Sequence, residues 1–505
     1  LLYGDLMAKL NKSWDDFSLN AAIGTSITDT RTSALRLDSK TASLYYPNVF
    51  TIANINMSSS AYIEESDDAR RQMQSFFAMA QLGYKESLYL DVTARNDWSS
   101  TLAFTERKSR GFFYPLVGLS WIIPKSFSMP SLISFGKVRA SWSKVGNDIP
   151  LFVSNTVGHI AAGGIPQPND TAPFGTLKPE MSSSFEIGTE WKFFDYRMDV
   201  DFTFYKTNTK NQLFSLPSSA GAAYKYYFVN AGNIQNMGVE LTFGAVPILT
   251  NQFKWNTTLN FSRNKNEVKK LHDDLASFIQ GDEGFSSSYT MRLVEGGSFG
   301  DIYGKAFERD KYGAIVYGRD GLPQEIGSGN TAKVGNCNPA FLLGWGNSFT
   351  YKDFSFYFLI DGHFGGDVLA QTQAVLDQTG VSKVSGEART MGYVDLEGHH
   401  IYNIKGFYEQ VGGRNGVTEY YMYDATNIRL RELSLGYTLP KRLLGRKQFV
   451  KKAELSFVAR NLFFIYKKAP FDPDAVLSAS NSNQGIDIFG IPTTRSVGFN
   501  VKLSF

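Results

Sequence analysis

The 505-residue sequence has little cysteine and little histidine. Its single cysteine, Cys337, excludes an internal disulfide framework. It has five histidines, and no serine–histidine–acid arrangement stands out, so we predict no enzyme and no catalytic residue. The formal net charge of +3 is too small to indicate a nucleic-acid partner.

Long apolar runs are also missing. No window of about 18 uninterrupted apolar residues occurs, which excludes membrane-spanning helices. No signal peptide opens the chain, because residues 1–10 already alternate between apolar and polar side chains. We therefore expect the chain to start inside a strand, as a fragment or a processed product does.

Aromatic residues are abundant instead, with 40 Phe and 26 Tyr. In the last ten residues, Val497, Phe499, Val501, Leu503 and Phe505 alternate with small or polar residues. Successive side chains of a strand point to opposite faces, so this pattern predicts a strand with one apolar and one polar face. Its length matches the roughly 9–11 residues with which a tilted strand crosses a bilayer.

The same alternation recurs along the chain and predicts about fifteen strands. In residues 198–205, for example, Phe202 is expected on the apolar face and Thr203 on the polar face. A soluble sandwich also has a solvated polar face, so alternation alone does not identify a membrane barrel. Further segments of this kind are residues 17–24, 88–95, 138–142, 185–191, 237–245, 253–261, 341–349, 354–360 and 455–465.

The connections favour the barrel. Outer-membrane barrels have tight periplasmic turns and long extracellular loops, whereas structureless loops above about 15 residues are uncommon in compact soluble domains. We therefore predict an all-β fold, a transmembrane antiparallel β-barrel. The predicted turns are residues 13–16, 85–87, 194–196, 247–251 and 352–353, with 124–133 and 441–451 somewhat longer. The predicted loops are about 29–70, 98–110, 145–181, 207–235, 265–340, 364–425 and 466–493.

Two finer expectations follow. Bacterial single-chain barrels have an even number of strands, so fifteen cannot close alone. We expect residues 1–505 to be the carboxy-terminal part of a larger transmembrane barrel. The apolar pattern also slips between Leu430 and Leu433, which predicts a β-bulge near Arg431 and Glu432.

Several motifs resemble the SusC/RagA-type TonB-dependent transporters of Bacteroidetes-like outer membranes. Residues 427–440, which read Asn-Ile-Arg-Leu-Arg-Glu-Leu-Ser-Leu-Gly-Tyr-Thr-Leu-Pro, are similar to a hallmark strand of that family. Ala-Arg-Asn-Leu at 459–462, Asp-Pro-Asp at 472–474 and Pro-Thr-Thr-Arg-Ser at 492–496 resemble the segments that follow it. Residues 94–100, 137–142, 232–241 and 264–268 resemble earlier family segments, in the family's order.

This resemblance implies active import through the outer membrane by a plugged barrel of about 22 strands. It places the signal peptide, TonB box and plug before residue 1, outside this chain. The implied partners are a SusD-type surface lipoprotein that lids the barrel, TonB through the absent amino-terminal region, membrane lipid, and a nutrient oligomer of the glycan or peptide class. The alternatives are a passive porin or a structural barrel, with an embedded enzyme third.

The sequence offers few candidate ligands for a metal or cofactor, and we predict none. Adjacent His399 and His400 cannot easily share one ion, and no cysteine or acidic spacing supports them, so we interpret them as a solvated loop pair. His363, at a loop entrance, is interpreted as lumen-facing or structural.

Loop aromatics are the candidate contacts for a ligand or a lid. A tyrosine combines an apolar ring with a hydroxyl, which suits sugars, peptides and protein interfaces. The alternative is that these rings form the aromatic girdle of the membrane or pack the loops together. The candidates are Tyr224, Tyr226, Tyr227 and Phe228 in one loop and Tyr393, Tyr402, Tyr420 and Tyr421 in another.

Overall fold

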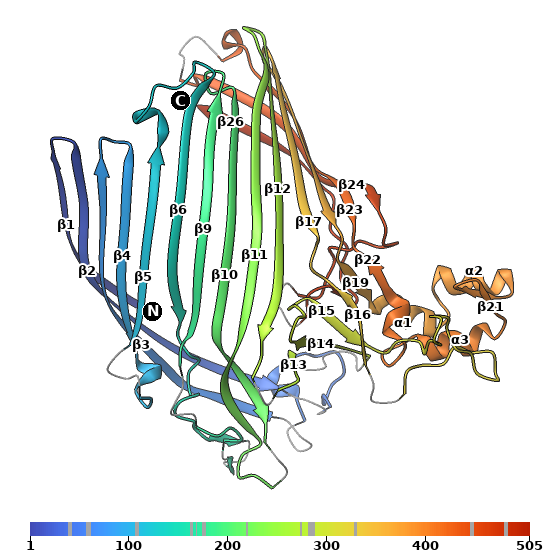
Figure 1. Cartoon of the computed structure of the whole chain (residues 1–505). Coiled ribbons are helices and arrows are strands. Elements are labelled where there is room, and N and C mark those ends of the chain that lie inside the picture. The colour runs from blue at the N-terminus through green and yellow to red at the C-terminus, as the bar shows by residue number, and fades with distance from the viewer. Residues whose placement is uncertain are drawn as a thin grey trace. The chain divides into compact units, whose positions relative to one another are not determined.

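A computed structural model gives the fold as one large antiparallel sheet with smaller sheets and helices in its connections (Figure 1). Fifteen strands form the large sheet, in the order β1-β2-β3-β4-β5-β6-β9-β10-β11-β12-β17-β18-β23-β24-β26, which confirms the all-β class and the predicted number. Within the part described, no helix is long and apolar enough to cross a membrane. The structure describes residues 1–38, 43–56, 62–106, 111–161, 165–167, 169–173, 178–218, 221–272, 275–280, 288–327, 331–444, 449–478 and 483–504.

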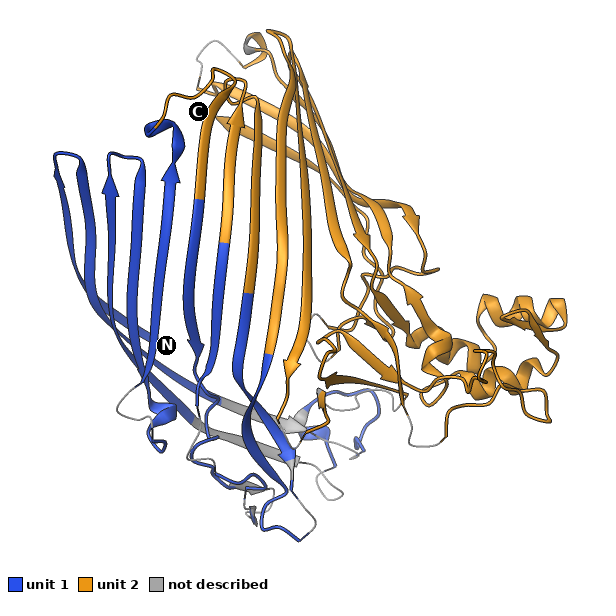
Figure 2. Cartoon of the chain, viewed as in Figure 1, with its two compact units in different colours: residues 1–126, 139–186, 207–233 blue, residues 127–138, 187–206, 234–505 orange. Residues whose placement is uncertain are grey.

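The chain divides into two compact units (Figure 2). Unit 1 comprises residues 1–126, 139–186 and 207–233, and its five first strands pair antiparallel in chain order. They are β1 (Leu2–Trp14), β2 (Phe17–Asp38), β3 (Tyr62–Tyr84), β4 (Leu88–Ser99) and β5 (Phe112–Ile122). A small hairpin, β7 (His159–Ala161) and β8 (Ile165–Gln167), also belongs to unit 1. Four further strands have residues in both units: β6 (Ile133–Asn147), β9 (Glu180–Phe193), β10 (Met198–Pro217) and β11 (Tyr226–Leu249).

Unit 2 comprises residues 127–138, 187–206 and 234–505. Its long strands pair antiparallel with one another, each with the next in the sheet order. They are β12 (Phe253–Lys270), β17 (Phe341–Tyr351), β18 (Phe354–Phe364), β23 (Asn427–Thr438), β24 (Lys452–Lys467) and β26 (Ser496–Ser504).

The strands of unit 2 have the alternating faces that the sequence predicts. In β26, Val497, Phe499 and Val501 share one face, and Phe499 is 77% exposed. A soluble protein rarely exposes a large apolar patch, so this face is suited to lipid. Phe505 lies outside the described residues. In β10 the prediction also agrees, since Phe202 is 38% exposed and Thr203 only 8%.

The tight turns lie where they were predicted. β3 ends at Tyr84 and β4 begins at Leu88, while β17 ends at Tyr351 and β18 begins at Phe354. Lys85 and Glu86 have φ of 51° and 50°, in the left-handed region that tight hairpin turns require. A residue other than glycine there costs on the order of 1–3 kcal/mol, which pairing of the two long strands offsets.

The predicted bulge is confirmed. Glu432 pairs with Leu359 and Leu430 with Ile360, so Arg431 has no partner opposite it on β18. The register against β24 shifts between the same two residues. The side chain of the extra residue in a bulge points in a different direction from that of a regular strand residue, and here that residue is Arg431.

The prediction of long irregular loops is wrong in two respects. Strands run far into them: β10 extends to Pro217 and β11 begins at Tyr226, so most of the predicted 207–235 loop is strand. Segments 265–340 and 364–425 contain folded structure, because their apolar residues are numerous enough to form a core of their own. Composition rich in Gly, Ser and Asn indicated loops, but pairing and burial override such local preferences.

We call the folded part of these connections, with residues 483–490, the loop fold. It belongs wholly to unit 2. Ser382 caps α2 by accepting from the Ser385 amide, Gly392 ends that helix with φ of 85°, and Asn403 caps α3. Its helices are α1 (Gln371–Gln378), α2 (Lys383–Met391) and α3 (Ile404–Val411). Its strands are β13 (Ser277–Gln280), β14 (Tyr289–Val294), β15 (Asp301–Gly304), β16 (Ala332–Asn336), β19 (Asp367–Ala370), β20 (Val394–Leu396), β21 (His399–Ile401), β22 (Met422–Asp424) and β25 (Ile486–Asp487).

Candidate functional site

The polar face of unit 2 is built from residues that lie opposite one another on neighbouring strands. Asn260 pairs with Gly344, Gly344 with Asp361, and Asp361 with Arg429. Directly opposite residues share a face of an antiparallel sheet, so these four form one row. The adjacent row holds His363 and Asn427.

A hollow of about 470 Å³ lies on this face. Gly344 forms part of its lining, and a Cβ at this position would meet only the Cβ of Asn260, at 3.9 Å. The hollow therefore exists because the row has no side chain at that strand. Three carboxylates line it, those of Glu240, Asp361 and Asp474, against the guanidinium of Arg431.

A set of ion pairs, which we call the motif network, adjoins the hollow. Arg431 donates from Nε to Asp361 Oδ2 at 2.7 Å and from Nη1 to Asn461 at 3.1 Å. Arg429 pairs with Asp474 and donates to Thr493 Oγ1 at 3.1 Å. Each residue except Asp361 comes from one of the four carboxy-terminal motifs that resemble the SusC/RagA-type transporters. The network comprises Asp361, Arg429, Arg431, Asn461, Asp472, Asp474 and Thr493.

The motif network attaches the segment that follows β24, through Asp472, Asp474 and Thr493, to strand β23 of the large sheet. Arg429 is 1% exposed, lies 4.4 Å from the centre of the Phe464 ring, and reaches Asp472 at 3.8 Å. Burial by itself would raise the pKa of Asp472. Hydrogen bonds from Thr493 and the Asp474 amide, with the charge of Arg429, lower that pKa below its usual value instead.

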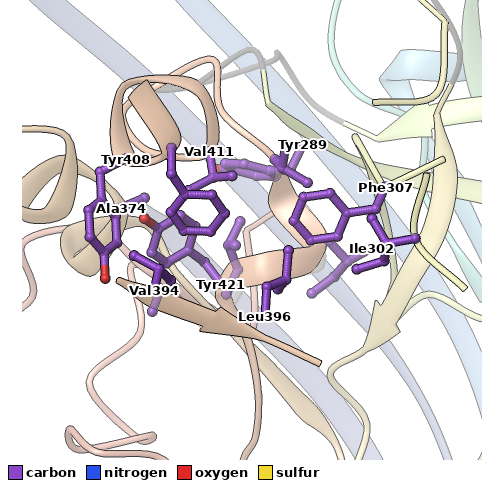
Figure 3. Close-up of a cluster of buried hydrophobic side chains, with 14 of the residues drawn as sticks. Tyr289, Ile302, Phe307, Ala374, Val394, Leu396, Tyr408, Val411 and Tyr421 are labelled. Atoms are coloured by element: carbon purple, nitrogen blue, oxygen red, sulfur yellow. The ribbon is translucent and has the colours of Figure 1, made fainter. Parts of the chain in front are cut away.

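The loop fold has a continuous apolar core (Figure 3). Tyr408, Val411 and Tyr421 lie within it, and Figure 3 shows them beside Ala374 and Val394. Asp377, also buried, accepts from the Tyr421 hydroxyl at 3.1 Å and from Gln373 at 2.6 Å. Burial raises the pKa of Asp377, although these hydrogen bonds act in the opposite direction.

One arginine ties three parts of the loop fold together. Arg309 donates to Glu397 and to Glu419, both at 2.8 Å. The hydrogen bond from Arg309 lowers the pKa of Glu397 below its usual value. Paired charges at half-exposed positions contribute little stability individually, so we assign Arg309 to orientation of these segments rather than to stability.

The first group of predicted contact residues lies in unit 1. Tyr224, Tyr226 and Tyr227 are exposed at and before the start of β11. Phe228 packs against a small buried cluster that contains Leu102 and Phe112. The three tyrosine rings are exposed, and their role as contacts for a ligand or a lid stays a prediction.

The second group lies in the loop fold and divides by burial. Tyr402 is 75% exposed, and Tyr393, half-buried, stacks on His400 with ring centres 4.0 Å apart. Tyr420 packs against Phe407, and Tyr421 is buried, which raises its hydroxyl pKa. Tyr421 therefore holds the core together and presents almost no surface to a ligand. The loop-packing alternative describes Tyr420 and Tyr421 in this structure.

His399 and His400 are exposed, as expected of a solvated pair, but they lie in the short strand β21 rather than in an irregular loop. His399 contacts Tyr317, and His400 approaches Asp395 at 3.8 Å. His363 lines the hollow on the polar face. Among the residues whose positions are given, no group of three His, Cys, Asp or Glu could hold a metal ion.

Arg429 and Arg431 lie in the motif at residues 427–440, but nothing in the sequence indicates their roles or that of Asp361. The predicted bulge could have indicated a role for Arg431, because a bulge changes the direction in which a side chain of the strand points. The sequence did not indicate a role for Gly344, since a glycine can occur in a strand for many reasons.

Comparison with known proteins places this architecture in a family. The family profile described as TonB dependent receptor-like, beta-barrel matches residues 2–462. TonB-dependent receptor P3 of Formosa agariphila is 26% identical over 89% of this chain and 47% of its own length. TonB-dependent receptor SusC of Bacteroides thetaiotaomicron is 22% identical over 88% of the chain and 46% of its own length. The chain thus spans about half the length of the curated relatives it matches.

A solved structure has the same fold. The RagAB peptide importer in its open-open state matches with a TM-score of 0.77 and 18% identity, over all of this chain and 54% of the other. These matches confirm the resemblance that the carboxy-terminal motifs indicated.

Proposed function

Because this chain belongs to the TonB-dependent receptor-like β-barrel family and is part of an outer-membrane barrel, we propose that it serves active import as the carboxy-terminal barrel portion of a SusC-like transporter. The observation that carries the proposal is the joint placement of the four motifs. They meet in one network beside a hollow on the polar face of the sheet, the face that lines the hydrophilic path of a transporter. The curated relatives are named as receptors, and none as an enzyme.

The cargo is proposed to be a nutrient oligomer of the glycan or peptide class. One solved relative is titled a peptide importer, which supports the peptide class for that protein. Three carboxylates line the hollow against one guanidinium, so the hollow does not favour a strongly anionic cargo.

Two partners complete the proposal. A SusD-type surface lipoprotein would cover the loops, and TonB would supply energy through a region outside these 505 residues. The exposed tyrosines Tyr224, Tyr226, Tyr227 and Tyr402 are the proposed contacts for the lipoprotein or cargo, because tyrosine is enriched in interfaces.

Uptake measurements test this proposal. A strain that lacks the gene, complemented with the full-length protein, is given labelled oligosaccharides and peptides with and without a protonophore. Active import requires uptake that the gene restores and the protonophore abolishes. Uptake that persists without energy would instead identify a passive porin.

A matched pair of glycines links transport to the polar face. Gly344→Leu fills the hollow, and the open space beside Gly344 lets the strand keep its fold. Gly346→Ala, on the same face and strand, adds a methyl 3.5 Å from the Tyr357 hydroxyl and outside the hollow. We expect slower uptake with the first variant only.

A further inference from the structure

A second pocket, of about 520 Å³, lies in the loop fold, separate from the hollow on the polar face. The end of α1 provides Asp377 and Gln378, and α2 provides Arg389 from its last turn. Tyr402 and Asn403 precede α3, and Glu409 projects from within it. Three helix ends therefore surround one concavity.

The apolar core of the loop fold supports one wall of the pocket. Tyr408 lies in its wall and within the core, next to Phe407, which is fully buried. Arg389 donates to the Gly380 carbonyl at 2.9 Å, which joins α2 to the segment after α1. The Asn403 side chain accepts from the Gly406 amide at 3.0 Å. A site whose walls are fixed before binding loses little entropy when a ligand enters.

The lining combines one exposed ring with planar polar groups. The Tyr402 ring is largely open to solvent, and its edge meets Tyr393 with centres 6.4 Å apart. Gln378 and Asn403 carry amides, which both donate and accept, and Arg389 only donates. A sugar ring matches this set, because its apolar face packs on an aromatic ring while neighbouring hydroxyls both donate and accept.

Charge and backbone geometry argue against other ligands. Arg389 and Lys405 oppose Glu409 and Asp377, so the pocket has no strong excess of either sign. One common mode of recognising an extended peptide, addition to a free strand edge, is not offered by these walls, because they are helix ends. The set therefore favours an uncharged ligand that is rich in hydroxyls.

We propose that this pocket binds a neutral oligosaccharide, with the Tyr402 ring as its platform and Asn403, Gln378 and Arg389 as hydroxyl partners. The inference names the cargo class of the proposed importer and rests on that function only for the step of transport. Capture would take place on the loop fold, away from the polar hollow.

Binding to the purified full-length protein in detergent tests the inference. The probes are maltoheptaose, cellohexaose, laminarihexaose, xylohexaose and mannohexaose, with hexagalacturonate and hexaalanine as charged-sugar and peptide comparisons. We expect at least one neutral sugar to bind with an affinity that salt does not change. Tyr402→Ala should weaken that binding about tenfold, and Tyr402→Phe should largely retain it.

Tyr312→Ala is the matched control, because Tyr312 is an exposed tyrosine of the same fold outside the pocket. The inference is overturned if no neutral sugar binds, if both alanine variants bind equally well, or if hexaalanine shows the Tyr402 dependence instead. Retained sugar binding without energy-dependent uptake would refute the proposed transport while leaving this site in place. Energy-dependent uptake without sugar binding would do the reverse.

Discussion

Arg429 shows how one side chain can decide the course of a long loop. It is buried, and it holds Asp472, Asp474 and Thr493 from a segment more than 40 positions further along the chain. Buried charges are tolerated only when they are paired and hydrogen-bonded. The arginine and the two carboxylates therefore depend on one another.

Replacing that arginine by methionine should detach the segment. Arg429→Met leaves Asp472 without its buried cation and should cost about 3–5 kcal/mol, whereas Arg429→Lys keeps the charge and should cost less. Denaturant unfolding of the full-length protein in lipid vesicles gives the stability, and limited proteolysis near residues 468–478 shows the detachment. Unchanged stability of Arg429→Met would contradict the importance given to the network.

The pKa of Asp472 predicts how acid affects this segment. A carboxyl with a lowered pKa in the folded state stabilises that state at neutral pH, and the stabilisation is lost as the pH falls below its unfolded value of 3.8. Burial raises the pKa of Asp487, so the contribution of Asp487 to the pH dependence of stability has the opposite sign. The measurement must therefore report on residues 468–478 alone. Relative to an unfolded substrate at the same pH, pepsin should cleave there faster at pH 2 than at pH 4. Arg429→Met should reduce this difference.

Neighbouring residues of β26 test which face meets lipid. Val501 lies on the apolar face and Asn500 on the polar face, one residue from each other near the middle of the strand. Val501→Arg should cost about 2–4 kcal/mol if that face lies in the bilayer, while Asn500→Arg should be nearly neutral. Equal losses in a vesicle folding titration would contradict the assignment of the two faces.

The strands and their connections indicate how the chain is oriented in the outer membrane. Tight turns such as the one after β17 lie at one end of their strands, and the loop fold connects to the other end of β18 and β23. By the rule for outer-membrane barrels, we expect the first to be periplasmic and the second extracellular.

Cysteine labelling tests this orientation at two exposed glutamates. In a Cys337→Ser background, Glu397→Cys in the loop fold should react with an impermeant reagent on intact cells. Glu86→Cys, in the turn between β3 and β4, should react only after the outer membrane is permeabilised. The reverse pattern would invert the topology.

The sheet as a whole has fifteen strands, with β1 and β26 at the ends of its order. Neighbours alternate in direction, so with an odd number the two end strands run the same way and cannot complete an antiparallel ring. We therefore expect these 505 residues, expressed alone, to form no heat-resistant barrel on a gel. A stable conducting pore from this chain alone would contradict that expectation.

The sequence by itself determined the alternating parts of the fifteen long strands, their faces, the tight turns and the bulge at Arg431, but not how far the strands extend. These features are local: alternation and turn residues act over a few positions, and each side of a strand follows from its own neighbours. The motifs also indicated the family, because each is a contiguous segment.

Only the tertiary structure determined the features that depend on residues far apart in the sequence. Gly344 became the lining of a hollow through Asp361, across the adjacent tight turn, and through Asn260, on a strand far earlier in the chain. Tyr402 and Tyr421 looked alike in the sequence, yet one is open to solvent and the other is buried beside Asp377. Burial depends on contacts between distant segments, and those contacts form only when the whole loop fold packs.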